Sequence, residues 1–184
     1  MSNFVFKSND YESNDGMLTT VWGPSQWHFL HTMSFNYPIH PTEFQKKVYR
    51  NYMLNLKHVL PCGKCRNNLK ENYKKLPLHM SYMRNRDTFS RYVYELHELI
   101  NEMLGKTSGL SFEQVRERYE HFRSRCTKTK REILKKRKTM KTKREKGCTE
   151  PLVGEKSKCI LKIVPQKMKC ESFTMDKKCI KQKV

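Results

Sequence analysis

Two cysteines, Cys62 and Cys65, are separated by two residues in the segment LPCGKCRNNLKENY. A thiol pair at this spacing can bind a metal ion, form a structural disulfide or transfer electrons. A zinc site needs about four ligands, and the chain has neither a second C-x-x-C nor a histidine pair at the usual gap, although scattered cysteines leave a zinc-stabilised module open. A disulfide across so small a loop stabilises a fold little, and a thioredoxin-like pair would need a βαβ context. The motif and its surroundings therefore favour redox chemistry.

The residues around the pair favour thiolate formation. A helix is expected to begin at the C-x-x-C, and the unpaired N–H groups of a first helical turn stabilise negative charge. Lys64 and Arg66 flank the motif and would act in the same direction, although an ordinary solvated charge is an equal alternative for Lys64.

The elements that must position this pair are predicted to be helices, because apolar residues recur at helical spacing and no segment shows strand alternation. The first helix is expected to open at Gly23 and Pro24, since proline suits the first helical position, and to end before Pro38. The second is expected over residues 42–59. Its predicted inward stripe consists of Phe44, Val48, Tyr52, Leu56 and Val59.

Three further helices are expected. One runs from the C-x-x-C to Pro77, and the next runs from Asp87 to a capping Gly105. A short fifth helix opens at Ser111 with a Ser-x-x-Gln capping pattern and ends near Arg123. The predicted fold is therefore all-α, a four-helix bundle with a short fifth helix, followed by a basic and largely flexible C-terminal tail.

Charge divides the chain. Residues 1–122 contain 16 Lys and Arg against 12 Asp and Glu, whereas residues 123–184 contain 22 against 6, a balance of +16. Like charges at this density repel one another and bury nothing. The expected segments are a loose leader (1–20), the helical domain (21–125), a basic linker (126–147) and a tail rich in lysine and cysteine (148–184).

Bulk composition bounds the class of protein. No stretch approaches the roughly 18 consecutive apolar residues of a membrane span, and the polar N-terminus lacks a signal-peptide core, so a soluble protein made in the cytosol is expected. Seven cysteines are many for a reducing compartment, where disulfides tend to be catalytic. Five cysteines lie outside the C-x-x-C, and their pairing is left open: Cys126, Cys148, Cys159, Cys170 and Cys179.

Three segments in order carry a family resemblance. They are WGPSQWHFLHTMSFNYP from Trp22, PCGKC from Pro61, and HELINEMLGK from His97. Their Trp-x₃-His-Thr, C-x-x-C and His-x-x-Ile-Asn motifs, with the following Leu-Gly-Lys, resemble those of the Erv/ALR family of FAD-linked sulfhydryl oxidases. The basic chain with its long tail looks most like a branch found in large cytoplasmic DNA viruses, which implies a location in the host cytoplasm or the virion.

The resemblance implies a bundle that holds FAD noncovalently beside the C-x-x-C. Cys65 corresponds to the cysteine proximal to the flavin, and Cys62 to the distal one that meets incoming thiols. The residues that match cofactor-binding positions of the family are Gly23, Trp27, His31, Tyr37, His97, Asn101 and Lys106. Two departures stand out: Glu98 replaces the usual asparagine after the helix-four histidine, and the usual structural disulfide near the bundle has no counterpart, which leaves Cys126 free or paired with the tail.

The function expected from the resemblance is oxidation of protein dithiols, with electrons passing through the C-x-x-C and flavin to oxygen and hydrogen peroxide released. A homodimer is usual in such a family. The tail cysteines could shuttle electrons, or the basic tail could bind nucleic acid or an acidic partner, or only solubilise. The alternative function is a non-catalytic nucleic-acid-binding protein on a helical scaffold.

Overall fold

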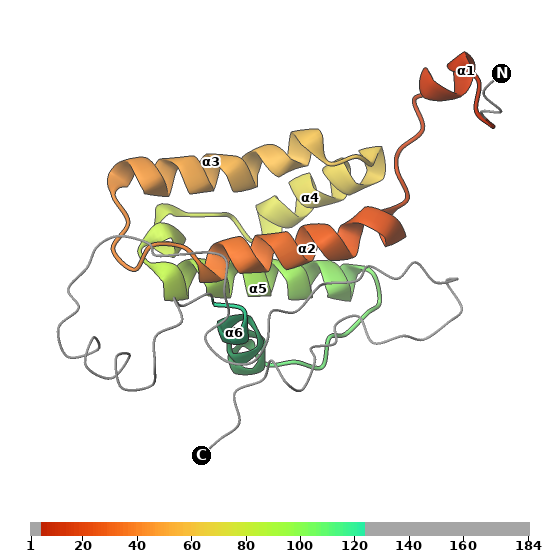
Figure 1. The fold of residues 1–184 in the computed structure, drawn as a ribbon. Helices are drawn as coiled ribbons and strands as arrows, with labels where there is room; N and C mark the ends of the chain where they lie inside the picture. The colour runs from red at the N-terminus through yellow and green to blue at the C-terminus, as the bar shows by residue number, and fades with distance from the viewer. Residues whose placement is uncertain (1–4, 124–184) are drawn as a thin grey trace, which may run out of the picture. The chain divides into compact units, whose positions relative to one another are not determined.

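A computed structural model describes residues 5–123, and the predictions for the linker and the tail lie outside the described residues. The chain divides into two units, with the boundary between residues 108 and 109. The described helices of the first unit are α1 (Ser8–Tyr11), α2 (Thr19–Phe35), α3 (Glu43–Val59), α4 (Gly63–Lys75), the 3₁₀ helix η1 (Met80–Met83) and α5 (Arg86–Met103) (Figure 1). The described part of the second unit contains α6 (Phe112–His121). The predicted all-α fold is confirmed, since residues 5–123 contain no strand.

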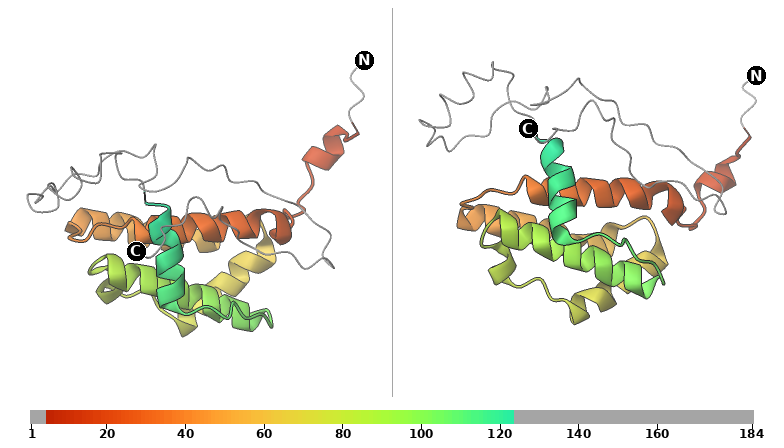
Figure 2. Two further views of the ribbon diagram at one scale, coloured as in Figure 1. Left: turned by 60° about the horizontal axis from the view of Figure 1, so that its bottom comes forward. Right: turned by 90° about the horizontal axis from the view of Figure 1, so that it is seen from below.

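Helices α2, α3, α4 and α5 form the bundle. Helix α2 lies along α5 and α3 packs against α4, while η1 contacts both α3 and α5 (Figures 1 and 2). The centre of the bundle is apolar and fully enclosed. Its most deeply buried side chains include Tyr37, Met53, Met83, Phe89, Tyr92, Val93 and Leu96. Within residues 5–123, no helix is long and apolar enough to cross a membrane.

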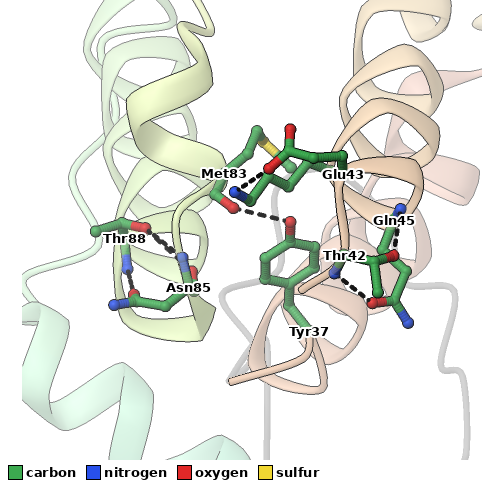
Figure 3. A network of polar contacts seen from close by, with 8 residues as sticks. Tyr37, Thr42, Glu43, Gln45, Met83, Asn85 and Thr88 are labelled. Carbon is green, nitrogen blue, oxygen red and sulfur yellow. Dashed lines mark hydrogen bonds and ion pairs between the residues drawn. The ribbon is translucent and has the colours of Figure 1, made fainter. Parts of the chain in front are cut away.

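Side chains cap the helix ends. Thr42 and Gln45 cap α3, and Asn85 and Thr88 cap α5. Within each pair, the side chain of each residue accepts a hydrogen bond from the backbone N–H of the other (Figure 3). The capping pattern predicted at Ser111 is present at the start of α6. Gly105 ends α5 with a φ of 64°, the left-handed conformation in which glycine has no steric penalty. These local signals explain why most helix boundaries follow from the sequence.

The predicted start of the first helix is wrong. Helix α2 begins at Thr19, one turn before Gly23, and Pro24 lies inside it. The first turn forms before the proline because the N–H groups of Val21 and Trp22 donate to the carbonyl of Leu18. Pro24 has no N–H to donate to the carbonyl of Thr20, yet the helix continues past it to Phe35.

The predicted inward stripe of α3 is also wrong, except at Leu56. Phe44, Val48, Tyr52 and Val59 are exposed, and the buried face consists of Met53 and Leu56 with Tyr49 and Leu60 partly buried beside them. The helix carries two apolar stripes at helical spacing, so periodicity does not decide which one faces the bundle. Packing against α4 and η1 decides it.

Candidate active site

The C-x-x-C lies at the start of α4, as the sequence predicts. Cys62 and Cys65 form a disulfide, with their Cα atoms 5.2 Å apart. Cys62 is the N-cap residue, and its Sγ accepts a hydrogen bond of 3.2 Å from the backbone N–H of Cys65. Both cysteines are half-buried. A half-exposed disulfide at a helix N-terminus is reachable by an attacking thiolate and sits where a negative charge is stabilised.

The two cations that flank the motif behave differently. The guanidinium of Arg66 donates to the carbonyl of Leu60 at 2.5 Å, so this side chain folds back over the turn that precedes the disulfide. Lys64 is exposed. Through this hydrogen bond, Arg66 stabilises the backbone of the turn at Leu60.

A second cluster forms where α2 meets α5. His31 Nε2 and His97 Nδ1 are 2.9 Å apart, and the ring of Trp27 stacks on that of His97 with centroids 3.9 Å apart and 8° between the planes. His31 is 4 % exposed. The structure thus brings together three of the predicted cofactor-binding residues. The two histidines that share the hydrogen bond are 66 positions apart in the sequence.

Both histidines of the cluster are neutral near pH 7. Burial lowers the pKa of His31 to about 3, and the repulsion that a protonated His31 would meet from protonated His97 or His28 acts in the same direction. Burial also lowers the pKa of His97 to about 4, against the opposing effect of the Glu98 carboxylate. Because neither ring is charged, one nitrogen of the pair donates and the other accepts. Flat, neutral and partly desolvated rings are suited to stacking against an aromatic cofactor.

Helix α2 connects the two parts of the site. Thr19, Gly23, Trp27 and His31 follow one another at four-residue intervals, so they lie along one side of the helix. Thr19 contacts Cys65, with Oγ1 3.5 Å from Sγ, and His31 lies about 18 Å further along the axis at the usual helical rise. This side of α2 therefore runs from the disulfide to the histidine cluster.

The remaining predicted residues lie in different places. Gly23 is buried in α2, and Asn101 lies one turn beyond His97 on α5, where its Nδ2 donates to Glu98 at 3.1 Å. Lys106 follows α5, is exposed, and its backbone N–H donates to the carbonyl of Asn101.

Tyr37 lies in the apolar core. Its ring contacts Tyr49 and Phe89, and its hydroxyl donates to the carbonyl of Met83 at 3.0 Å (Figure 3). Burial raises the pKa of Tyr37 to about 12. Its cofactor role stays a prediction from the resemblance.

Sequence reasoning missed the residues at the start of α2 and just before it. Thr19 contacts Cys65 Sγ, and Met17 hydrogen-bonds to the residue that precedes Cys62. These contacts join positions more than 40 apart, and a segment without periodicity gives no sequence signal for them. Among residues 5–123, no group of three or more His, Cys, Asp or Glu side chains gathers in a way that could hold a metal ion.

The site thus combines a disulfide at the start of α4 with the rings of Trp27 and His31 on α2 and of His97 on α5. This combination is the one predicted for a dithiol redox protein. Comparison with known proteins agrees with this: the family model of the Erv1/Alr family matches residues 24–120, more than half of the 184 residues. The chain therefore belongs to the Erv1/Alr family.

Curated relatives come from viruses and eukaryotes. A probable FAD-linked sulfhydryl oxidase of Acanthamoeba polyphaga mimivirus is 35% identical over 90 residues, which is 49% of this chain and 63% of that protein. The FAD-linked sulfhydryl oxidase of Arabidopsis thaliana is 33% identical over 84 residues, 46% of this chain and 42% of that protein. The match thus spans less than two thirds of these relatives.

A solved structure shares the fold. The crystal structure of the yeast Erv1 core superposes with a TM-score of 0.52 and 22% identity, covering 65% of this chain and 97% of that one. At this identity the likeness concerns the fold alone.

Proposed function

We propose that this protein is an FAD-linked sulfhydryl oxidase that forms disulfides in protein dithiols. The observation that carries the proposal is the half-exposed Cys62–Cys65 disulfide at the start of α4, joined through α2 to the Trp27, His31 and His97 cluster. Membership of the Erv1/Alr family and relatives named as sulfhydryl oxidases support it.

The cysteines perform two exchange steps. A substrate thiolate attacks Sγ of Cys62, a mixed disulfide forms, and Cys65 leaves as a thiolate. The second thiolate of the substrate then attacks the substrate sulfur of that mixed disulfide and releases Cys62. The substrate has lost two electrons, and the cysteine pair has gained them.

The cluster fits a flavin adenine dinucleotide. Trp27, His31 and His97 offer uncharged rings for its aromatic parts, and Asn101 lies one turn further along α5. Gly23, Tyr37 and Lys106 remain the other predicted contacts. When bound, FAD supplies a two-electron acceptor that restores the cysteine disulfide and passes the electrons to oxygen, which leaves as hydrogen peroxide.

The contact of Thr19 supports the order of the two cysteines. Thr19 begins α2, the helix that carries Trp27 and His31, and it touches Cys65. We therefore assign Cys65 as the proximal cysteine and Cys62 as the one that meets substrate.

The exposed stripe of α3 supports a homodimer. Phe44, Val48, Tyr52 and Val59 form it, and Phe29 of α2 lies against Tyr52 edge-on at 6.3 Å. An apolar patch of this kind on a monomer typically marks a contact surface.

Sedimentation of the wild-type chain and of Tyr52→Lys tests the homodimer. The wild-type chain should sediment as a dimer and Tyr52→Lys as a monomer. A monomeric wild-type chain would refute the dimer.

The viral relatives support a viral protein that acts in the host cytoplasm or the virion. Nucleic acid as a partner of the basic tail stays a prediction that concerns residues outside the described part. Quantifying the protein in purified virions and in infected-cell cytoplasm tests the location.

A spectrum and an oxygen electrode test the function. The purified full-length chain should show flavin absorbance and should consume oxygen when a small dithiol is added. Cys65→Ser should keep the flavin and lose turnover. A colourless chain that takes up no FAD and consumes no oxygen would overturn the proposal and favour the non-catalytic alternative.

A matched pair of variants tests the cofactor site. Trp27→Leu removes the ring that stacks on His97, whereas Phe29→Leu removes an exposed ring from the same helix. Flavin content should fall in the first variant and persist in the second. Equal flavin content in both would refute the assignment of the cluster.

A further inference from the structure

Hydrogen bonds hold the segment just before α2 beside the disulfide. The backbone N–H of Met17 donates to the carbonyl of Pro61 at 2.8 Å. The carbonyl of Met17 in turn accepts a hydrogen bond of 3.1 Å from Nε1 of Trp22. Met17 is thus anchored on one side to the residue before Cys62 and on the other to the first turns of α2.

Gly16 lies close to the backbone of the redox motif. A Cβ at Gly16 would lie 3.2 Å from the Cα of Cys62 and 3.2 Å from the carbonyl oxygen of Pro61. Both are backbone atoms, so they cannot move aside as a flexible side chain would. The segment therefore lies directly against the turn that carries Cys62, and glycine allows it.

These contacts hold the start of α2 beside the disulfide. Thr19 is the first residue of α2, and its Oγ1 is 3.5 Å from Sγ of Cys65. A disulfide sulfur carries no hydrogen, so the hydroxyl donates. The described polar contact of Cys62 Sγ is a different one, with the backbone N–H of Cys65. The two sulfurs of the pair thus have different hydrogen-bond donors.

We propose that Thr19 is a catalytic residue whose hydroxyl donates to the thiolate of Cys65 in the reduced pair, and so makes Cys65 the sulfur that leaves and Cys62 the one that is attacked. The inference rests on the proposed oxidase function. A hydrogen bond to the charged form of an acid favours that form, so the Cys65 thiol gives its proton to solvent more readily. A thiol of lower pKa is the better leaving group in thiol–disulfide exchange.

The charge state of Cys65 can be measured without turnover. In the full-length Cys62→Ser chain, Cys65 is the remaining cysteine of the motif, and serine keeps an oxygen acceptor at the N-cap of α4. Iodoacetamide labelling of the peptide that contains Cys65 is followed by mass spectrometry from pH 5 to 10. The midpoint of the labelling rate reports the pKa of Cys65.

Adding Thr19→Val to this chain keeps the branched shape and removes the hydroxyl. The midpoint should rise by on the order of one pH unit, because a hydrogen bond to a charged group is lost. Thr19→Ser should keep the original midpoint. Thr20→Val, the same change at the neighbouring exposed threonine, is the matched control and should also keep it. A midpoint unchanged by Thr19→Val, or moved equally by Thr20→Val, would overturn the inference.

A second measurement uses the chain with both cysteines. In a glutathione redox buffer at pH 8, Thr19→Val should shift the pair toward the disulfide by about 3- to 10-fold, since the reduced form loses its stabilised thiolate. Gly16→Ala should shift it in the same direction by pushing the segment off the turn, and no shift in either variant would refute the role of the segment.

Failure of this inference can be told apart from failure of the oxidase proposal. Neither labelling nor the glutathione equilibrium requires flavin or oxygen. If the chain is an active oxidase but the labelling midpoint of Cys65 does not change in Thr19→Val, only the role of Thr19 is overturned. A chain that responds to Thr19→Val but consumes no oxygen would overturn only the oxidase function.

Discussion

The two ends of α2 serve the site in opposite ways. At its start, Thr19 contacts a half-exposed disulfide whose cysteines are three residues apart. Near its end, His31 is buried and meets His97, which is 66 residues away. The disulfide is thus half-exposed, whereas the ring cluster is buried at His31 and half-buried at Trp27 and His97. Under the proposed function, the chemistry takes place in the first region, and the second contributes to stability and to binding.

The largest expected effect is at the disulfide, where a substitution should abolish catalysis and leave the stability of the fold nearly unchanged. Cys62→Ser removes the sulfur that a substrate attacks, so dithiol oxidation should fall by at least ~10³-fold. Under reducing conditions its free energy of unfolding should stay within about 1 kcal/mol of wild type, because serine also caps a helix well. Oxygen consumption and urea unfolding measure the two quantities. Retained turnover, or a large loss of stability, would contradict the proposed difference between the two ends of α2.

A smaller effect concerns the histidine cluster and pH. The unfolded imidazoles take up protons below pH 6.5, whereas burial holds the native pKa values of His31 and His97 at about 3 and 4. The unfolded state therefore binds more protons as the pH falls from 7 to 5, and the native state loses up to about 2 kcal/mol per histidine. Urea unfolding at the two pH values measures this loss.

The variant His97→Asn isolates that effect. Asparagine cannot take up a proton, so about half of the pH-dependent loss should disappear, while changes from carboxylates remain in both chains. An equal loss in wild type and variant would show that the cluster does not carry the pH dependence.

The smallest effect is expected at Tyr37, in the core beyond both regions. Tyr37→Phe removes the donor to the Met83 carbonyl and should lower the free energy of unfolding by about 1 kcal/mol. Flavin content should be unchanged if the tyrosine acts only in packing. Thermal unfolding and the flavin absorbance of the same sample measure both, and a loss of flavin would instead support the cofactor role that the resemblance predicts.

Local signals predicted much of the fold. Thr42, Asn85 and Ser111 cap helices through contacts with residues three positions on, and Gly105 ends α5. The start of α2 was missed because Pro24 gives a strong local signal, whereas the anchoring of Met17 to Pro61 is a distant contact. The inward side of α3 was missed because it has two apolar stripes of similar spacing.

The sequence by itself determined the C-x-x-C pair, since Cys62 and Cys65 are held together by the geometry of a single helical turn. It also determined the helices, whose caps and periodicities act over three or four residues. Only the tertiary structure decided that His31 meets His97, that Tyr49 rather than Tyr52 faces the bundle, and that Thr19 reaches Cys65. Those contacts join distant residues, and the free energy of burying one helix face against another selects them.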